Sequence, residues 1–479
     1  MVSHHFVYQL VLVALIWFFV VLHLTRPRLG VSAPVTPVEP DSLKPKRPQS
    51  SEPKPFEGLT HKPHCVLWEH DPAQPQPSPP VPPDPMPSPN RRPREIDTSR
   101  QFCPHAGCDY RGWLGLGNLR ANGHPSGGPW RQFHCTSCRG YFLETHGTIV
   151  HSQQAEAEFI VRVLACLAEG LGIRATARVC EAAPNTVLQW RAEAAEPLRA
   201  FSASFLCDLH LEQLQLDEWY AVLRDFKAGE IKDDEAIERL ERSPDWVSTA
   251  MDPQSKLLVV VDVGCRTLAM AQRVVHQVSR VLVPGCVPLG LTDGLKDYPT
   301  ALLTHFGYWI QPERRQDKGP RPKPRWMPLP ALLYAQVVKA YRRRRLVGVT
   351  HRVVFGTQLA IKQVLASWGW TINTACIERL NLDIRQCVAA VGRRVNPLCQ
   401  GEAGLQDRLV LFQVYHNVVF PHASLRQRLS HPEVTNGSGS AKVWRPCTPA
   451  LAAGLTDHVW SLKEVLLYRV PPWPQPRTV

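Results

Sequence analysis

Two groups of residues in this chain have the types and the spacing that metal chemistry requires. The first is a set of cysteines in two close pairs, each in a short turn that contains or adjoins a glycine: Cys103, Cys108, Cys135 and Cys138. Such turns let two sulfurs approach one point, so two of them predict a tetrahedral thiolate site for Zn²⁺. His105 and His134 lie beside the pairs and are alternative ligands. Thiol redox chemistry is the weaker interpretation, because no thioredoxin-like βαβ pattern surrounds the second pair.

The second group consists of acidic residues that follow or lie within regular elements: Asp217, Asp293 and Glu378. The first follows a strand-like run at Leu211–Leu216, the second follows another at Val287–Thr292, and the third lies in an expected helix at Asn373–Val391. Carboxylates at strand ends project into a shared cleft at the edge of a sheet. Such an oxygen-rich set suits two Mg²⁺ or Mn²⁺ ions, which support in-line displacement at a phosphodiester. The alternative for each residue alone is a solvated surface carboxylate.

The helix that carries the glutamate has two faces. Its apolar residues form one stripe that must pack inward: Ile377, Leu380, Ile384, Val388 and Val391. Glu378, Asn381 and Arg385 share a different face, which is expected to point toward the strand ends. Arg385 would then orient the glutamate or contact a phosphate. Asp262 is a rival for the second aspartate but is expected inside a strand, and Asp297 is a candidate secondary ligand.

A helical region lies between the cysteines and the first aspartate. An apolar stripe predicts one helix that ends at Gly170, and a shorter helix is expected at Ile173–Cys180. Pro184–Thr186 offers a turn and an N-cap before a third helix at Val187–Ala195. Two helices joined by a short turn can place the second one in the major groove of DNA, although an ordinary helical bundle has the same periodicity. The candidate base-reading side chains are Gln189 and Arg191.

The composition favours a polyanionic partner. Lys plus Arg number 55 and Asp plus Glu number 42, which gives a net charge of +13 and a pI near 9.2. Nucleic acid is the commonest partner of so basic a chain, and the plain alternative is a soluble protein with a basic surface. One arginine run is predicted to contact the DNA backbone, or else to form a solvated helix face. It comprises Arg342, Arg343, Arg344 and Arg345.

The N-terminal part has a different character. Phe6–Leu24 is an apolar run of about the length that spans a membrane. It is expected to be a membrane anchor or an uncleaved signal, or else an extension outside the functional protein. The stretch that follows, up to residue 98, is rich in proline and predicts an extended linker that cannot form a core. Outside the two close pairs the cysteines are scattered, which indicates a reducing compartment.

Several short motifs follow one another along the chain. They are Phe133–Arg139 at the second cysteine pair, Leu216–Trp219 at the first aspartate, Thr292–Gly294 with Tyr298 at the second, Asn373–Asn381 at the glutamate, and Tyr415–Asn417 with Pro421–Arg426. From about Gln101 to Arg428 the chain resembles the transposases of bacterial insertion sequences, closest to the insertion-sequence-one type. The resemblance implies an RNase H-like domain in which Asp217, Asp293 and Glu378 bind Mg²⁺ or Mn²⁺ for DNA cleavage and strand transfer.

The resemblance also implies the partners and the location. The substrate would be double-stranded DNA, both the element ends and the target, and the pairing of two ends requires a homodimer or a higher oligomer. The location would be the cytoplasm, at the bacterial nucleoid. The basic, Pro-rich insertion at Arg314–Pro330 and residues 1–98 have no counterpart in this pattern. Two alternatives remain: a non-catalytic DNA-binding regulator or decayed transposase, and a membrane-tethered protein whose stalk displays a binding domain.

The expected fold class is α/β, because short β-branched runs alternate with helical stretches after Leu211. We expect an RNase H-like mixed sheet flanked by helices, preceded by a zinc ribbon and a small all-α domain. The segments are 1–30, a hydrophobic N-terminal segment; 31–98, a Pro-rich linker; 99–150, the zinc ribbon; 151–204, the helix-turn-helix domain; 205–428, the catalytic domain; and 429–479, a C-terminal tail.

Overall fold

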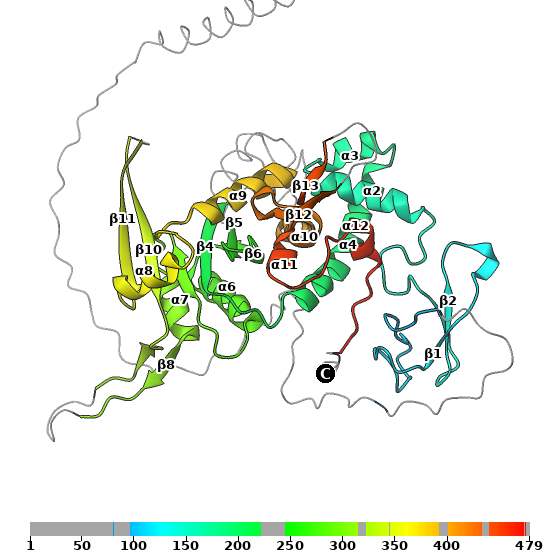
Figure 1. Cartoon of the computed structure of the whole chain (residues 1–479), viewed down its shortest axis with the longest axis horizontal. Coiled ribbons are helices and arrows are strands. Elements are labelled where there is room, and N and C mark those ends of the chain that lie inside the picture. The colour runs from blue at the N-terminus through cyan, green and yellow to red at the C-terminus, as the bar shows by residue number, and fades with distance from the viewer. Residues whose placement is uncertain are drawn as a thin grey trace, which may run out of the picture. The chain divides into compact units, whose positions relative to one another are not determined.

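The computed structural model describes residues 80, 96–221, 245–314, 322–343, 345–391, 401–433, 440–473 and 475 (Figure 1). The apolar run Phe6–Leu24, nearly all of the expected linker 31–98, and Arg344 lie outside these residues. The expectations about an anchor and a spacer therefore stay predictions. Within the described ranges, every helix is too short or too polar to cross a membrane.

The first described module is a small antiparallel sheet around the cysteines. Its elements are β1 (Leu119–Ala121), the 3₁₀ helix η1 (Pro125–Gly127), β2 (Gln132–Cys135) and β3 (Tyr141–Leu143). The strands pair in chain order. Phe133 stacks on Phe142 with ring centroids 5.7 Å apart, and the cysteines form much of the remaining core. A core this small is the kind that a bound metal ion stabilises.

Three helices follow: α2 (Ala157–Ala168), α3 (Ile173–Val179) and α4 (Pro184–Phe205). α2 ends where the sequence predicts, because Gly170 adopts a φ of +94°, a left-handed conformation that side chains disfavour. A Cβ at this glycine would also lie 2.7 Å from the carbonyl oxygen of Gln386. Gly170 is therefore required both by the turn and by the close approach of the neighbouring backbone.

The third helix departs from its expected bounds at both ends. The N-cap expected within Pro184–Thr186 is wrong: the proline is already helical, and Ala183 occupies the cap position. Proline is favoured at the first position of a helix because the N–H group that it lacks would have no helical partner there. The helix also continues past Ala195, because Leu198 and Phe201 extend its buried stripe.

The central sheet is mixed in direction. Its strands are β4 (Gln213–Tyr220), β5 (Asp245–Met251), β6 (Leu258–Cys265), β7 (Leu289–Thr292), β10 (Tyr334–Arg342) and β11 (Arg345–Phe355). They lie in the order β11, β10, β7, β4, β5, β6. β7 is parallel to both β4 and β10, whereas β5 is antiparallel to β4 and β6, and β11 is antiparallel to β10. An antiparallel meander is thus extended by two parallel strands.

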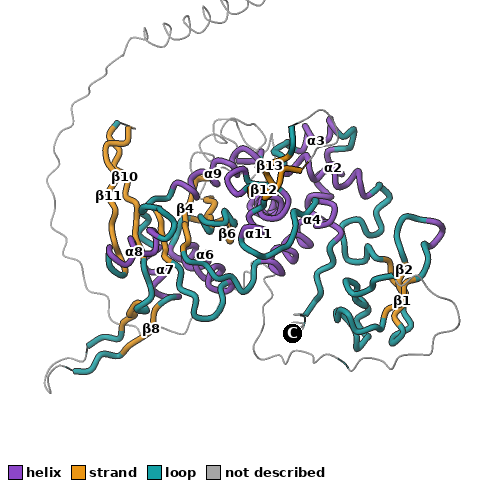
Figure 2. Tube along the Cα trace, in the orientation of Figure 1, coloured by secondary structure: helices purple, strands orange, loops and turns teal. Residues whose placement is uncertain are grey.

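Helices cover both faces of this sheet (Figures 1 and 2). They are α6 (Leu268–Val281), α7 (Tyr298–His305), α8 (Gln358–Ala366), α9 (Ala375–Cys387) and α10 (Gly401–Val414). On one face, α6 and α7 pack against Leu214 and Leu216 of β4. On the other, α9 and α10 pack against Trp219 of the same strand, and α8 packs against Leu291 of β7. The expected α/β class with a mixed sheet flanked by helices is confirmed.

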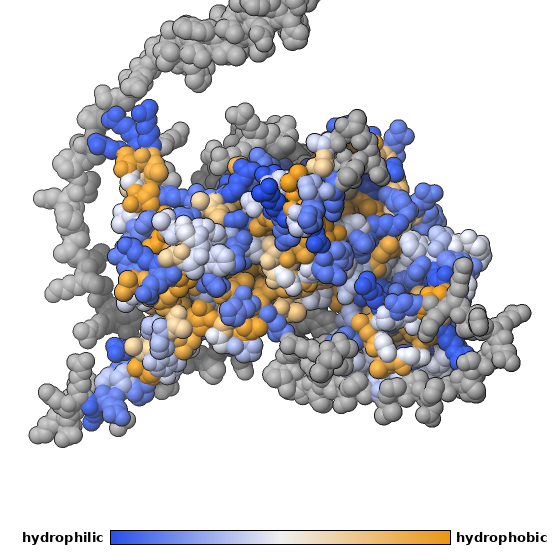
Figure 3. Space-filling view, in the orientation of Figure 1, coloured by the Kyte–Doolittle hydropathy of each residue, from blue (hydrophilic) through white to orange (hydrophobic). Residues whose placement is uncertain are grey.

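Two hairpins belong to this region. β8 (Gly307–Ile310), which precedes the basic insertion, pairs with β9 (Arg325–Pro328) within it; residues 315–321 lie outside the described part. In the longer hairpin, β10–β11, the arginine run lies at the turn, so the alternative of a solvated helix face is wrong. Figure 3 shows a hydrophilic tip on this hairpin above a hydrophobic surface. The exposed apolar side chains of β11 are Leu346, Val347 and Val349.

The expected C-terminal tail carries regular structure. It contains most of β12 (Gln427–Glu433), and all of β13 (Lys442–Arg445), α11 (Pro449–Ala452) and α12 (Leu462–Leu467). The 3₁₀ helices η2 (Ala389–Val391) and η4 (Ala423–Leu425) and the π-helix η3 (Tyr415–Val419) precede it. α12 packs against α2 and α4. Beyond it, the Trp473 indole N–H donates to the Arg111 carbonyl at 2.7 Å, and Gln475 accepts from the Leu114 N–H at 3.0 Å. The end of the chain therefore holds the cysteine module against the helices.

Candidate metal centres

The four cysteines converge, as their spacing predicts. The Sγ atoms of Cys103 and Cys138 lie 3.7 Å apart, and those of Cys108 and Cys135 also lie 3.7 Å apart. All four sulfurs lie within 4.8 Å of one another. A tetrahedron of sulfurs about 2.3 Å from a zinc ion has edges of about 3.8 Å. This cysteine cage therefore has the dimensions that a tetrahedral Zn²⁺ site needs.

Groups around Cys135 favour the thiolate form that binds zinc, whereas burial raises the pKa of the Cys103 and Cys108 thiols. The Asn118 side chain donates a hydrogen bond to Sγ of Cys135 at 3.4 Å. Burial raises the pKa of the Cys135 thiol, but the backbone N–H of Cys138 and the Asn118 amide outweigh that effect and lower the pKa to about 7. The outer shell thus stabilises a charged sulfur in an otherwise apolar core.

The two candidate histidines lie in different surroundings. Nδ1 of His105 is 3.4 Å from the Sγ atoms of both Cys103 and Cys138. Its ring packs so tightly on Gly140 that a Cβ at that glycine would lie 2.3 Å from a ring carbon. The His134 ring instead packs against the neighbouring tyrosine of β3, with centroids 4.5 Å apart. Of the two alternative ligands, only His105 lies at the cage.

The two aspartates lie side by side. β4 and β7 are parallel, and their register pairs Leu216 with Thr292, so Asp217 and Asp293 follow at the same level of adjacent strands. A carboxylate oxygen of each lies within 4.8 Å of the other and of one from Glu218. We call these three side chains the acidic group. Since Mg²⁺ holds oxygen ligands at about 2.1 Å, two of its ligands can be up to about 4.2 Å apart, which is close to this spacing.

One expectation about the first aspartate is wrong. Asp217 does not end its strand, because β4 continues to Tyr220. The register with β7 stops at Leu216, but the antiparallel pairing with β5 carries the strand on to Tyr220. The carboxylate therefore lies at the end of the neighbouring strand, not of its own. The apolar and polar alternation of the sequence could not reveal where a neighbouring strand stops.

α9 holds the first aspartate in place. The buried Asn381 amide donates from Nδ2 to Oδ2 of Asp217 at 2.8 Å, and its Oδ1 accepts from the Thr249 hydroxyl at 2.9 Å. The backbone N–H of Glu218 donates to the other aspartate oxygen at 3.0 Å. Ile377, Leu380 and Ile384 of the apolar stripe are buried, as predicted, but the helix ends at Cys387, before the end expected at residue 391. Asn381 does point toward the strand.

Glu378 lies at the margin of the acidic group. The Thr374 hydroxyl donates to its Oε1 at 2.7 Å, and the same oxygen forms an ion pair with Lys339 of β10. Its side chain is 45% exposed. Its charge raises the pKa of Asp217, although among the described residues it is not within the 4.8 Å cluster. The expected glutamate is thus electrostatically coupled to the pair and is held by a lysine that the sequence reasoning did not identify.

The sequence pattern did not identify Glu218 as a site residue, and its position differs most from expectation. Its side chain is only 2% exposed, and Nε of Arg266 donates to its Oε1 at 3.0 Å. That guanidinium stacks on Trp246 at 4.6 Å, and the buried Tyr298 hydroxyl lies beside the glutamate. Successive strand residues point to opposite faces, so the residue after Asp217 was expected to point away. The only available signal was the Asp-Glu pair itself.

Crowding perturbs the protonation of the acidic group. Burial and then the charge of Asp293 raise the pKa of Asp217 to about 6. Burial and then Asp293 likewise raise the pKa of Glu218 to about 7, although Arg266 acts in the opposite direction. Buried carboxylates that repel one another are stabilised by a cation, which reverses such shifts. The chemistry of the group therefore fits a divalent metal ion.

The other acidic and basic candidates have separate roles. Asp262 lies inside β6, is 2% exposed, and forms an ion pair with Arg273 at 2.8 Å, so its expected internal position is confirmed. Asp297 occupies the N-cap position of α7. The Arg385 guanidinium lies 4.7 Å from the ring centre of Trp219, on the face of the sheet that α9 covers.

The candidate DNA-binding residues differ in accessibility. Gln189 is exposed on α4 and donates to Glu193 at 2.7 Å. Arg191 is only 13% exposed and pairs with Asp407 of α10 at 3.7 Å, so its position does not favour base reading. The described arginines of the hairpin run are all exposed: Arg342, Arg343 and Arg345. Periodicity placed Arg191 on the helix but could not tell which face another helix covers.

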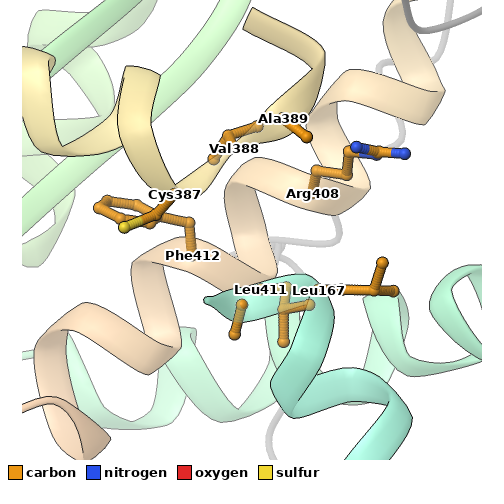
Figure 4. A pocket seen from close by; sticks show the side chains of 8 residues that line it. Leu167, Cys387, Val388, Ala389, Arg408, Leu411 and Phe412 are labelled. Atoms are coloured by element: carbon orange, nitrogen blue, oxygen red, sulfur yellow. The ribbon is translucent and has the colours of Figure 1, made fainter. Parts of the chain in front are cut away.

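A small pocket between α2, α9 and α10 shares no residue with either metal-binding group (Figure 4). It is lined by Leu167, Ala168, Cys387, Val388, Ala389, Arg408, Leu411 and Phe412. Its volume of about 10 Å³ is roughly that of one water molecule, so it is a packing gap between helices.

No protein-family model matches this chain, and no curated protein is significantly similar to it.

Proposed function

We propose that this chain is a DNA transposase that binds the ends of a mobile element and performs divalent-metal-dependent cleavage and strand transfer. One observation carries the proposal: Asp217 and Asp293 lie at the same level of adjacent parallel strands, beneath a helix that contributes Asn381 and Glu378. The antiparallel meander extended by two parallel strands, with helices on both faces, supports an RNase H-like fold for residues 205–428.

The protein's contribution to such chemistry is to hold oxygen ligands in place. Asn381 orients Asp217, the Leu295 backbone N–H donates to Asp293 at 3.1 Å, and Thr374 orients Glu378. Outer-shell hydrogen bonds of this kind fix the direction of a ligand's lone pairs. When bound, Mg²⁺ or Mn²⁺ would activate the attacking hydroxyl and stabilise the leaving oxygen of an in-line displacement.

The β10–β11 hairpin supports a role in DNA binding. Its turn carries Arg342, Arg343 and Arg345, all exposed, and a two-stranded ribbon has the width of the DNA major groove. Arginines at such a tip would contact phosphates, which contribute affinity but no base discrimination. β10 of the same hairpin also carries Lys339, the partner of Glu378, three residues before Arg342. DNA that lies along the hairpin would therefore lead into the acidic group.

The helices offer a second DNA-contacting surface. α3 and α4 are joined by a short turn, which is compatible with a helix-turn-helix, and Gln189 lies on the exposed side of α4. Arg174 and Arg178 of α3 are also exposed. These two arginines replace Arg191 as the basic residues of this surface. The cysteine cage would hold structural Zn²⁺, and the pairing of two element ends would require at least a homodimer.

The test is metal-dependent cleavage by the full chain, loaded with zinc. The purified protein is incubated with Mg²⁺ or Mn²⁺ and with DNA that carries the sequences flanking its own coding region, and nicked and joined products are separated. Asp217→Asn, Asp293→Asn and Glu378→Gln are each expected to reduce product by more than about a hundredfold, because losing a ligand costs more than losing its outer-shell partner. Glu433→Gln, an exposed carboxylate on β12, is the matched control and should retain full activity.

The outcomes separate the alternatives. DNA binding without metal-dependent cleavage, in the parent protein and the variants alike, would favour a non-catalytic regulator or a decayed enzyme. Cleavage that survives all three substitutions would move the active site elsewhere. Absence of both binding and cleavage would leave the membrane-tethered binding protein as the stronger alternative.

A further inference from the structure

The acidic group contains a carboxylate that the expected set of two aspartates and a glutamate does not account for. Glu218 is almost completely buried, and Arg266 binds its Oε1. Its Oε2 is also buried and has no hydrogen-bond partner within the described structure. Leaving a charged oxygen desolvated and without a partner is costly, so native proteins rarely do so without a reason. The glutamate that carries this unsatisfied atom belongs to a cluster whose carboxylate oxygens lie within 4.8 Å of one another.

The end of β7 explains how Glu218 reaches this cluster. Asp217 points to the face covered by α9, where Asn381 binds it, and Glu218 points to the opposite face, beside Tyr298 of α7. Asp293 follows the last residue of β7, so its carboxylate lies at the edge where both faces meet. The oxygens of all three residues consequently come within 4.8 Å of one another. If β7 had continued past Thr292, its backbone would have separated the Asp217 and Glu218 carboxylates.

We propose that Glu218 is a direct ligand of a divalent cation, shared with Asp217 and Asp293, and that this cation binds without Glu378. The inference deepens the proposed function and rests on it for the identity of the ion. Arg266 fixes one oxygen of Glu218 and leaves the other for the metal. Glu378, which Thr374 and Lys339 hold at the margin, is then available for a second ion.

The competing explanation is a structural ion pair. In that case Glu218 would serve only to hold Arg266, which also stacks on Trp246. Arg266 binds Oε1, and even with the interacting Tyr298 hydroxyl beside the carboxylate, Oε2 is left without a hydrogen bond. An ion pair also does not explain why the glutamate lies within the cluster of aspartate oxygens. The two explanations differ in what Arg266 does to metal affinity. As an orienting residue of a ligand it is dispensable, and as a nearby cation it competes with the metal.

The test measures Mn²⁺ binding by the full, zinc-loaded chain in the absence of DNA, from the loss of the free Mn²⁺ signal in electron paramagnetic resonance. Glu218→Gln is expected to weaken the tightest Mn²⁺ site by at least about tenfold. Glu378→Gln is expected to leave that affinity unchanged, as is the exposed control Glu433→Gln. Wild-type affinity in Glu218→Gln, or an equal loss in Glu378→Gln, would overturn the proposal.

Two further variants separate a ligand from a structural partner. Arg266→Met leaves the carboxylate and removes the competing cation, so Mn²⁺ affinity should stay the same or rise; a loss as large as that of Glu218→Gln would favour the ion pair alone. Glu218→Asp keeps the charge but shortens the side chain. This variant should fold as the parent does, yet its affinity for Mn²⁺ should be lower than that of the parent. Unchanged affinity in that variant would count against ligation.

Because the readout is metal binding, it is independent of cleavage. A protein that binds Mn²⁺ through Glu218 but never cuts DNA would refute the transposase proposal and leave this inference standing. If the parent protein cuts DNA and Glu218→Gln keeps the parent's Mn²⁺ affinity, the transposase proposal stands and Glu218 is not a ligand.

Discussion

The cysteine cage and the acidic group are both suited to a metal ion, but they are assembled over different distances along the chain. The cage comes from two short turns, one before β1 and one between β2 and β3, and each turn supplies two ligands by itself. The acidic group joins β4 to the residue after β7, under a helix that begins at Ala375. Local spacing therefore suffices for the first group, whereas strand register decides the second.

The two groups also differ in what happens without metal. The cage is a core of thiols that can remain neutral, so the missing ion costs the module its main source of stability. The acidic group lies in a domain that has a large hydrophobic core of its own. Its carboxylates repel one another when the ion is absent. We expect the cysteine module to need bound metal in order to fold, whereas in the acidic group metal only reduces the repulsion between carboxylates. The following experiments test that contrast.

The largest effect is expected from Cys135→Ser. Removal of one of four thiolates should abolish tight zinc binding, and structural zinc contributes roughly 10–16 kcal/mol of binding free energy in small modules. Bound zinc is measured by elemental analysis, and the loss of structure by proteolysis within residues 99–150. Cys207→Ser, an exposed cysteine outside the cage, is the control. Full zinc content in Cys135→Ser would contradict the four-cysteine site.

A smaller effect, on the order of 3 kcal/mol for each of two carboxylates, is expected from the pH dependence of stability in the absence of divalent metal. The pKa of Asp217 is raised from 3.8 to about 6, and that of Glu218 from 4.5 to about 7. The folded state therefore binds these protons more tightly than the unfolded state. Their stabilising contribution is complete below a pH of about 4 and is lost as the pH rises to about 7.

Urea unfolding from pH 4 to pH 8, with a chelator that spares the zinc, measures this slope. Asp217→Asn should flatten it, because the substitution removes one of the coupled charges, and Mn²⁺ should restore the stability of the parent at high pH. The same slope in parent and variant would show that the acidic group is not the source.

His105→Ala should have an effect of no more than about 1 kcal/mol on zinc binding, since four sulfurs already complete a tetrahedral site. The histidine lies beside two of them, so its removal opens the cage to water and should weaken zinc by less than about tenfold. Competition with a chromogenic chelator gives the affinity. Loss of one full equivalent of zinc would show instead that His105 is a ligand and that the cage is not made by cysteine alone.

The smallest effect is expected from Lys339→Met. The Lys339–Glu378 pair is partly exposed, with side chains 26% and 45% accessible, and such pairs are worth about 0–1 kcal/mol. Folding stability should hardly change. Removing the lysine should strengthen Mn²⁺ binding at the second, Glu378-containing site by less than about fivefold, because Glu378 loses its competing cation. A marked fall in metal affinity would show that Lys339 positions the glutamate rather than competes for it.

Features that depend on neighbouring residues could be predicted. The apolar stripe of α9, the end of α2 at Gly170 and the four cysteines all follow from periodicity or spacing. Features that depend on a distant segment could not. Asp217 lies inside its strand because β5 extends it, and Arg191 faces inward because Asp407 of α10 meets it.

By itself the sequence determined the cysteine cage, the amphipathic faces of the helices and the α/β class, because each is set by side chains within a few residues of one another. Only the tertiary structure decided which carboxylates meet. The end of β7 brings Glu218 to Asp293, and the β10 strand brings Lys339 to Glu378. Strand register and chain crossings arise from packing across the whole sheet, and no local pattern encodes them.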